Sequence, residues 1–393
     1  MIQIRLSQTL HTLAIQASDS SATLPVILYY CRPREEVRNC ILRRYGPIKY
    51  ELPFINAMAL DLPTHKLTAI AREPMVQWVT EDVTVTKAGG NPPLRGSGLF
   101  PLFDQRHVSL RTPVSVAVID TGVALHPDLL WPRNRIRAFY DLVNHREEPY
   151  DDDGHGTHIA GILCGLANIP RSEKGAKAAT VGSARSRALW SPALVIIKAL
   201  DEEGNGNASD ILAAMQWILN NRRYYNICVV NLSLGVTSKD SPDSDPLIRG
   251  VEALNRHDIT VVAAAGNSGP KSKTISSPGI SASVITVGAA DTTSDAVHVA
   301  SFSGRGPTPQ GLIKPDLVAP GVNIRSLDVS PCSEYVAQSG TSMAAPFVSR
   351  AVAKLCETFP GIDPATVKRI LLSQTQPIAG EPPEAQGRGI LTP

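Results

Sequence analysis

The chain contains the run Val116-Ala117-Val118-Ile119-Asp120-Thr121-Gly122. The nearly continuous apolar run of residues 114–119, which overlaps this stretch, is typical of a parallel strand that is covered on both faces. Thr121-Gly122 then turns the chain and leaves Asp120 at the carboxyl end of the strand. Open α/β sheets collect their functional groups at that edge. Taken alone, however, an aspartate there is more often an ordinary turn cap.

After this strand, apolar runs typical of strands alternate with helical patterns along the rest of the chain. Further strand candidates are residues 194–197, 227–230, 259–265 and 284–287. Helix candidates are residues 156–165, 209–220, 246–255, 342–357 and 363–372. This alternation predicts an α/β fold, a doubly wound and mainly parallel sheet with helices on both faces.

The N-terminal part predicts a separate, small α+β unit over residues 25–82. Strand candidates are residues 26–30, 55–62 and 75–79, with a further one at 48–52, and helices begin near Pro33 and Pro63. Glycine and proline turns between residues 83 and 112 indicate a domain boundary. We therefore expect four parts: an extension (1–24), a small domain (25–88), a linker (89–112) and a large domain (113–393).

Composition excludes several classes of function. The 393 residues carry a net charge of +2, which gives no electrostatic case for binding nucleic acid or an anionic membrane. The six cysteines contain no Cys-x-x-Cys pair, so we expect free thiols rather than a disulfide framework. No apolar run is long enough to span a bilayer and no signal-peptide core is visible. We expect a cytoplasmic protein, with secretion as the alternative.

Two more glycine-framed segments carry reactive side chains. They are Gly154-His155-Gly156-Thr157-His158 and Gly340-Thr341-Ser342-Met343-Ala344-Ala345-Pro346. A serine hydroxyl is a poor nucleophile unless a base takes its proton, and an imidazole base needs a carboxylate to hold its tautomer. Ser342 also begins a predicted helix, whose N-terminal N–H groups favour developing negative charge. Asp120, His155 and Ser342 are therefore candidates for acyl transfer.

A fourth segment, Ala263-Ala264-Ala265-Gly266-Asn267-Ser268-Gly269, ends a predicted buried strand. An asparagine at that point can donate a hydrogen bond to an oxyanion. Each segment alone has an ordinary interpretation, such as a turn asparagine or a serine helix cap. The occurrence of all four together, in this order, favours the catalytic interpretation.

These four segments resemble those of the subtilisin-like serine proteases, over most of residues 110–375. The resemblance implies that Asp120 orients His155, that His155 is the general base and acid, and that Ser342 is the nucleophile. Asn267 would be the oxyanion donor, with the Ser342 backbone N–H. The resemblance also assigns a substrate-binding strand and a specificity-pocket wall, made by Ser233, Leu234, Gly235, Ala264, Ala265 and Gly266.

Residues 25–88 resemble the inhibitory, ferredoxin-like propeptide of these proteases, and the chain looks most like their intracellular bacterial branch. The resemblance implies a self-inhibited precursor that is cut between residues 80 and 100. The partners expected are peptide or protein substrates and the chain's own propeptide. A monomer is expected, with no nucleic acid and no membrane partner. No cofactor and no catalytic metal is expected. A structural calcium ion stays open because no complete ligand set is identifiable.

Three alternatives remain. A non-catalytic relative would carry a degenerate triad, whereas all three positions are intact here. A transpeptidase or ligase would pass the acyl group to an amine instead of water. A metal hydrolase would use His155 and His158, with the acidic run 151–153 as extra ligands, but a solvated loop is the simpler interpretation of that run. The basic segment 171–187 is interpreted as a surface loop.

Overall fold

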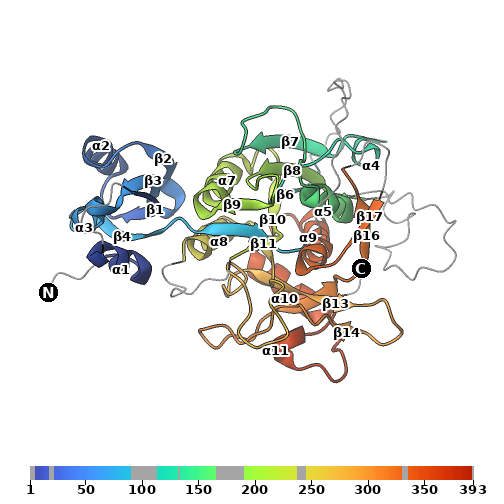
Figure 1. The fold of residues 1–393 in the computed structure, drawn as a ribbon. Coiled ribbons are helices and arrows are strands. Elements are labelled where there is room, and N and C mark those ends of the chain that lie inside the picture. The colour runs from blue at the N-terminus through green and yellow to red at the C-terminus, as the bar shows by residue number, and fades with distance from the viewer. Residues whose placement is uncertain are drawn as a thin grey trace.

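The computed structural model describes residues 5–16, 22–89, 113–131, 133–164, 190–236, 245–329 and 335–391. The expected surface loop 171–187 and nearly all of the linker 89–112 lie outside these ranges. A small N-terminal domain stands beside a larger α/β domain, and one extended segment connects them (Figure 1). In the described part of the chain, no helix combines the length and the apolar character needed to cross a membrane.

The small domain is a four-stranded antiparallel sheet with strand order β2-β3-β1-β4. Along the chain, its elements follow the β-α-β-β-α-β order of a ferredoxin-like fold, which confirms the predicted class. They are β1 (Thr23–Tyr30), α2 (Arg34–Arg44), β2 (Ile48–Leu52), β3 (Ala57–Pro63), α3 (Leu67–Ala71) and β4 (Val76–Glu81), with short 3-10 turns at Pro53–Ile55 and Thr64–Lys66.

The expected boundary at residue 24 is not present in the structure. Helix α1 (Gln8–Gln16) precedes the sheet, and Leu6 forms a parallel bridge with Val79 of β4. Leu6 and Leu10 are buried in the core that α2 and α3 also cover. Residues 5–16 therefore belong to the small domain, because their apolar side chains complete its core.

The large domain is built on an eight-stranded sheet with the order β14-β13-β12-β10-β6-β8-β7, and β15 pairs with β13. Every neighbouring pair is parallel except β13 with β14. The strands are β6 (Ser115–Asp120), β7 (Ile136–Asp141), β8 (Ala193–Lys198), β10 (Ile227–Leu232), β12 (Thr260–Ala264), β13 (Ile285–Asp291), β14 (His298–Val299) and β15 (Leu317–Pro320). The predicted doubly wound α/β class is confirmed.

Helices cover both faces of this sheet. The helices of the large domain are α4 (Pro127–Leu130), α5 (His155–Cys164), α7 (Ala208–Asn221), α8 (Pro246–Arg256), α9 (Thr341–Thr358), α10 (Pro364–Ser373) and α11 (Pro383–Gln386). A separate two-stranded sheet is formed by β16 (Ile324–Leu327) and β17 (Tyr335–Gln338). Alternate residues of β6 face opposite cores: Val116 and Val118 pack with α5 and α9, whereas Ala117 and Ile119 pack with α7 and α8. Burial on both faces explains the continuous aliphatic run.

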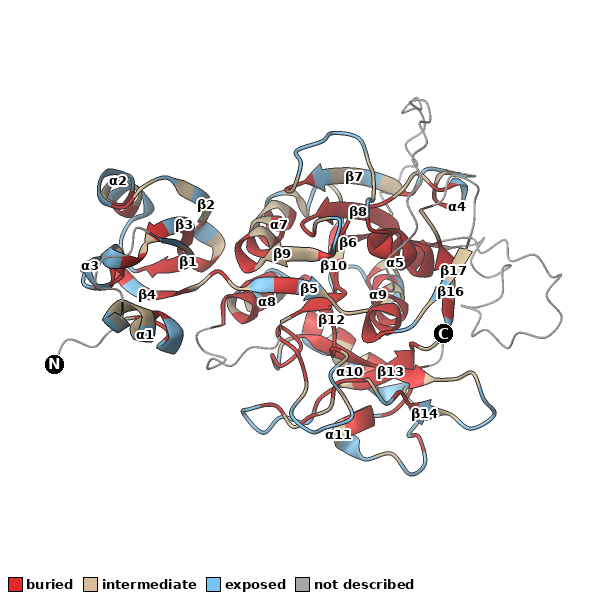
Figure 2. Ribbon diagram, viewed as in Figure 1, coloured by how far each residue is buried: buried red, intermediate tan, exposed pale blue. Residues whose placement is uncertain are grey.

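Residues 84–87 are a strand of the large domain rather than the end of the small one. β5 (Thr84–Lys87) lies between β11 (Leu234–Gly235) and β9 (Asn205–Asn207) and is antiparallel to both (Figures 1 and 2). The turn-rich break expected from residue 83 therefore begins after β5. The extended conformation of β5 depends on its pairing with β9 and β11, which are distant from it in the sequence.

Candidate active site

Asp120 and His155 form a buried pair at the carboxyl edge of the sheet. Asp120 ends β6, His155 begins α5, and the two side chains are 0% and 1% exposed. Asp120 Oδ1 lies 2.7 Å from His155 Nδ1 and also accepts the Thr121 N–H at 2.8 Å. This contact favours the tautomer that carries its proton on Nδ1. His155 Nε2 has no hydrogen-bond partner in the described part of the chain and is left as a proton acceptor.

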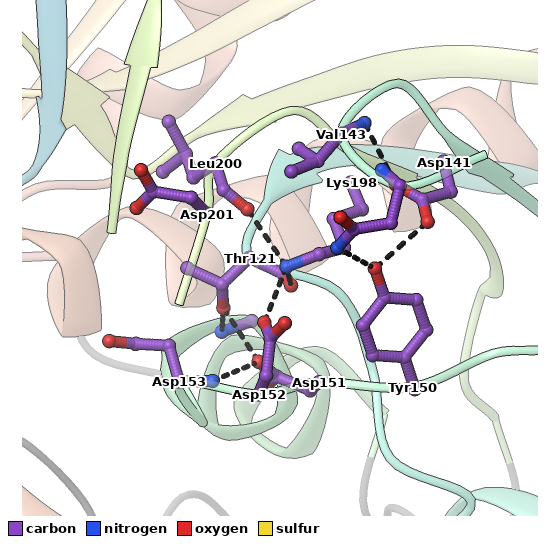
Figure 3. Close-up of polar contacts among 12 residues, drawn as sticks. Thr121, Asp141, Val143, Tyr150, Asp151, Asp152, Asp153, Lys198, Leu200 and Asp201 are labelled. Carbon is purple, nitrogen blue, oxygen red and sulfur yellow. Dashed lines mark hydrogen bonds and ion pairs between the residues drawn. The ribbon is translucent and has the colours of Figure 1, made fainter. Parts of the chain in front are cut away.

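The acidic run 151–153 holds the turn that follows Asp120. Asp151 Oδ1 accepts hydrogen bonds from the Thr121 hydroxyl at 2.9 Å and the Gly154 N–H at 2.8 Å (Figure 3). Asp151 Oδ2 accepts the N–H and the hydroxyl of Thr157 in the first turn of α5. One carboxylate therefore fixes Asp120's strand end and His155's helix start relative to each other. The expectation of a solvated loop is wrong, because these carboxylates have protein partners.

Lys198 also supports this turn through direct hydrogen bonds. Its fully buried ammonium donates to the Thr121 carbonyl at 2.7 Å, the Leu200 carbonyl at 2.9 Å and Asp152 Oδ1 at 2.5 Å (Figure 3). Lys198 pairs with Asp120 in the β6–β8 register. This lysine was not predicted from the sequence, although its position at a strand end after an aliphatic run was a signal.

Ser342 is the second residue of α9, and its neighbour in space is the carbonyl of Ala88. Ala88 O lies 2.5 Å from Ser342 Oγ and accepts hydrogen bonds from Asn267 Nδ2 at 2.6 Å and the Ser342 N–H at 3.3 Å. Ser342 Oγ also lies 3.0 Å from the Ser233 carbonyl. The donor pair expected of Asn267 and Ser342 thus surrounds one peptide carbonyl oxygen.

Thr341 orients Asn267, a function that sequence reasoning had not assigned to it. The Thr341 N–H and hydroxyl each bind Asn267 Oδ1 at 3.0 Å, and the Thr341 oxygen accepts the Gly266 N–H at 3.1 Å. The amide orientation of Asn267 follows from these donors, which occupy Oδ1 and turn Nδ2 toward Ala88. Thr341 had been considered only as a helix cap.

The predicted substrate-binding residues lie on both sides of this point. Leu234 and Gly235 form β11 and pair with Lys87 and Thr86, while the Ala88 N–H donates to the Ser233 carbonyl at 3.0 Å. Ala264, Ala265 and Gly266 lie buried at the end of β12, directly before Asn267. Their assignment to a pocket wall stays a prediction.

His158 forms its hydrogen bonds with backbone carbonyls of other elements. Its Nε2 contacts the carbonyls of Ile324 and Val336 at 3.0 and 3.2 Å, and burial, with a smaller contribution from His155, lowers its pKa to about 3. The two histidines are therefore not arranged as a metal-binding pair. Within the described ranges, no group of three or more His, Cys, Asp or Glu side chains could hold a metal ion.

A buried carboxylate–imidazole pair, a serine at a helix start and two donors around a carbonyl oxygen define the class of site: this is the arrangement that serine hydrolases use. Comparison with known proteins gives the family. The Peptidase_S8 family model, described as the subtilase family, matches residues 111–389, and the chain belongs to this family.

Several characterised proteases are similar to the chain. The serine protease AprX of Bacillus subtilis (strain 168) is 40% identical over 306 residues, which cover 70% of this chain and 64% of AprX. Subtilisin Savinase of Lederbergia lenta is 37% identical over 63% of this chain and 77% of its own length. Fervidolysin from Fervidobacterium pennivorans, a keratinolytic enzyme, has a similar structure with a TM-score of 0.69 at 21% identity, covering 95% of this chain and 61% of fervidolysin.

Proposed function

We propose that the protein is a serine endopeptidase that cleaves peptide bonds through an acyl-enzyme. The observation that supports this most strongly is the Ala88 carbonyl, whose oxygen lies 2.6 Å from Asn267 Nδ2 and 2.5 Å from Ser342 Oγ. A peptide group held between a nucleophile and oxyanion donors has the geometry of a bound substrate.

The reaction follows from the residues of this site. The Ser342 hydroxyl turns from the Ala88 carbonyl to His155 Nε2, gives up its proton there, and forms a bond to the carbonyl carbon. The negative charge on the carbonyl oxygen is stabilised by Asn267 Nδ2 and the Ser342 N–H. The imidazolium, paired with Asp120, then protonates the leaving amine as the C–N bond breaks. Water, deprotonated by the same imidazole, releases the acid and restores Ser342.

Covalent labelling tests the nucleophile. A serine-directed phosphonate should label the matured protein once, and Ser342→Ala should abolish both labelling and peptide hydrolysis. Ser373→Ala is the control, because Ser373 is an exposed serine at the end of α10 whose hydroxyl donates only to the Ile370 carbonyl of the same helix. Absence of labelling in the matured wild type would contradict the proposed activity.

We further propose that the small domain, together with β5 and Ala88, inhibits the enzyme and is removed by a cut at Ala88–Gly89. The carbonyl of this bond lies beside Ser342, and β5 pairs with β11 and β9 as an extended substrate would. A Cβ at Gly89 would lie 3.1 Å from the Ser339 carbonyl oxygen, so a glycine fits best after the bond. The interface also buries Ile27 and Tyr29 of β1 in one core with α7 and α8.

N-terminal sequencing tests the position of the cut. The active form should begin at Gly89, and the Ser342→Ala chain should keep its full length under the same conditions. Any other N-terminus would refute this position, and an uncut, fully active chain would refute self-inhibition altogether.

We also propose a monomeric, cytoplasmic enzyme without a cofactor. The cysteines in the described ranges, including the exposed Cys31, are unpaired, which fits a reducing compartment. Size-exclusion chromatography of the Ser342→Ala chain with light scattering should give one chain per particle. Cell fractionation should find the protein in the soluble cytoplasmic fraction.

A further inference from the structure

Lys87 precedes Ala88, and its side chain is directed at the large domain. In β5, Val85 and Lys87 face the large domain, whereas Thr84 and Thr86 face solvent. Val85 is fully buried in the core that α7 forms, and the Lys87 side chain is only 15% exposed. A lysine that was merely tolerated in this segment would extend its ammonium into water.

The Lys87 ammonium forms an ion pair with Asp153 Oδ2, and the Asp153 side chain is 3% exposed. Asp153 Oδ1 accepts the His155 N–H at 3.0 Å, so the carboxylate is fixed by the helix that carries the imidazole. Its orientation therefore belongs to the enzyme and does not depend on the segment in the cleft.

The opposite wall is Gly204, whose carbonyl accepts the Lys87 N–H at 3.0 Å. A Cβ at Gly204 would lie 2.5 Å from Lys87 Cδ and 2.7 Å from Cε, so the aliphatic stem lies directly on the glycine. Gly204 also has a φ of +79°, which a residue with a side chain rarely adopts. Together, Asp153 and Gly204 form a narrow channel with a negative charge at its end.

We propose that Asp153 makes this protease selective for a basic side chain at the second residue before the cleaved bond. The inference rests on the proposed peptidase function and identifies the class of sequence it cleaves best. When β5 leaves, Asp153 Oδ2 loses its ion-pair partner in the described part of the chain. The Asp153 carboxylate, which is 3% exposed while Lys87 covers it, then lacks its counter-charge, and a lysine or arginine of the substrate restores the ion pair.

Peptide substrates test this directly. The full chain, allowed to mature and titrated at its active site, is given Val-Thr-X-Ala peptides with a chromogenic leaving group, where X is Lys, Arg, Met or Glu. We expect kcat/KM for Lys to exceed that for Met by about 10- to 100-fold, as for a partly buried charge pair, and Glu to be cleaved least. Met is the matched uncharged side chain of similar length.

Asp153→Asn keeps the acceptor for the His155 N–H and removes only the charge, so the Lys-to-Met ratio should fall to about one. Glu203→Gln, an exposed carboxylate next to Gly204, is the matched control and should keep the wild-type ratio. Equal ratios in wild type and Asp153→Asn would overturn the inference. Failure to hydrolyse any of the peptides would overturn the proposed peptidase function, and this inference with it.

A double-mutant cycle in the intact precursor gives an independent answer. Lys87→Met and Asp153→Asn should each slow self-cleavage, and the double variant should be no slower than the slower single variant, because both remove the same contact. Multiplicative effects of the two substitutions would show that the residues act independently and would refute the pairing.

Discussion

Thr341 offers a sharp test of how the site is oriented. Thr341→Val replaces its hydroxyl by a methyl group of similar size in a fully buried position. Asn267 Oδ1 then loses one of its two donors and keeps the Thr341 N–H, and the Gly266 N–H loses its acceptor. The substitution should therefore weaken both the orientation of Asn267 and the stability of the fold.

The catalytic cost can be bounded from these contacts. Complete loss of an oxyanion donor costs about 100- to 1,000-fold in kcat, the range known for the asparagine of subtilisin. Because one of two orienting bonds remains, about half of that free energy should be lost, which corresponds to roughly 10- to 30-fold in kcat. KM should change little, since the donor acts mainly in the transition state. Burying the unpaired Gly266 N–H should lower the free energy of unfolding by about 1–3 kcal/mol.

Steady-state kinetics with one peptide substrate would compare wild type, Thr341→Val, Thr341→Ser and Asn267→Ala. Thr341→Ser keeps the hydroxyl and should retain near wild-type kcat. Asn267→Ala removes the oxyanion donor and gives the full decrease in kcat for comparison. Urea unfolding is measured in the Ser342→Ala background to prevent self-digestion. A Thr341→Val enzyme with wild-type kcat but reduced stability would refute the positioning argument.

Three further outcomes are expected. Lys198→Met should lower the free energy of unfolding of the Ser342→Ala chain by about 1–3 kcal/mol in urea titrations, because the buried carbonyls of Thr121 and Leu200 lose their donor; an unchanged midpoint would contradict this. The pKa of His158 is about 3, against an ordinary 6.5, so its neutral form stabilises the fold above pH 6.5 and this contribution is lost as the pH falls toward 3. His158→Gln should therefore lose less stability than its parent between pH 7 and pH 4, and an equal loss would refute the assignment. Dialysis of the matured enzyme against a chelator should leave kcat unchanged, and a loss restored by calcium would reveal a metal requirement.

Much of the architecture was predictable because it depends on local patterns. Parallel strands that are buried on both faces have aliphatic sequences. The aliphatic runs at residues 194–197 and 227–230 correspond to β8 and β10. β7 was missed because only one of its six residues is buried, so it lacks a continuous apolar run. Helix α1 was missed because its role depends on packing against a sheet formed later in the chain.

The candidate site also contains residues that local patterns predicted and residues that they did not. Asp120, His155 and Ser342 were visible as reactive side chains at predicted strand and helix ends, framed by glycine. Thr341 and the acidic run 151–153 were undervalued, because a threonine at a helix start and three successive aspartates have common, ordinary interpretations. Their function follows from hydrogen bonds to residues far away in the sequence.

The order of residues alone was enough to specify a parallel α/β sheet and the three reactive side chains, since strand periodicity, helix starts and glycine turns are encoded within a few residues. Only the tertiary structure places Ala88 beside Ser342. Ala88 and Ser342 are separated by 254 positions, and no local pattern relates them. The contact of Lys87 with Asp153 likewise depends on tertiary structure, because the pairing of β5 with β9 and β11 places the Lys87 side chain against a carboxylate from another element.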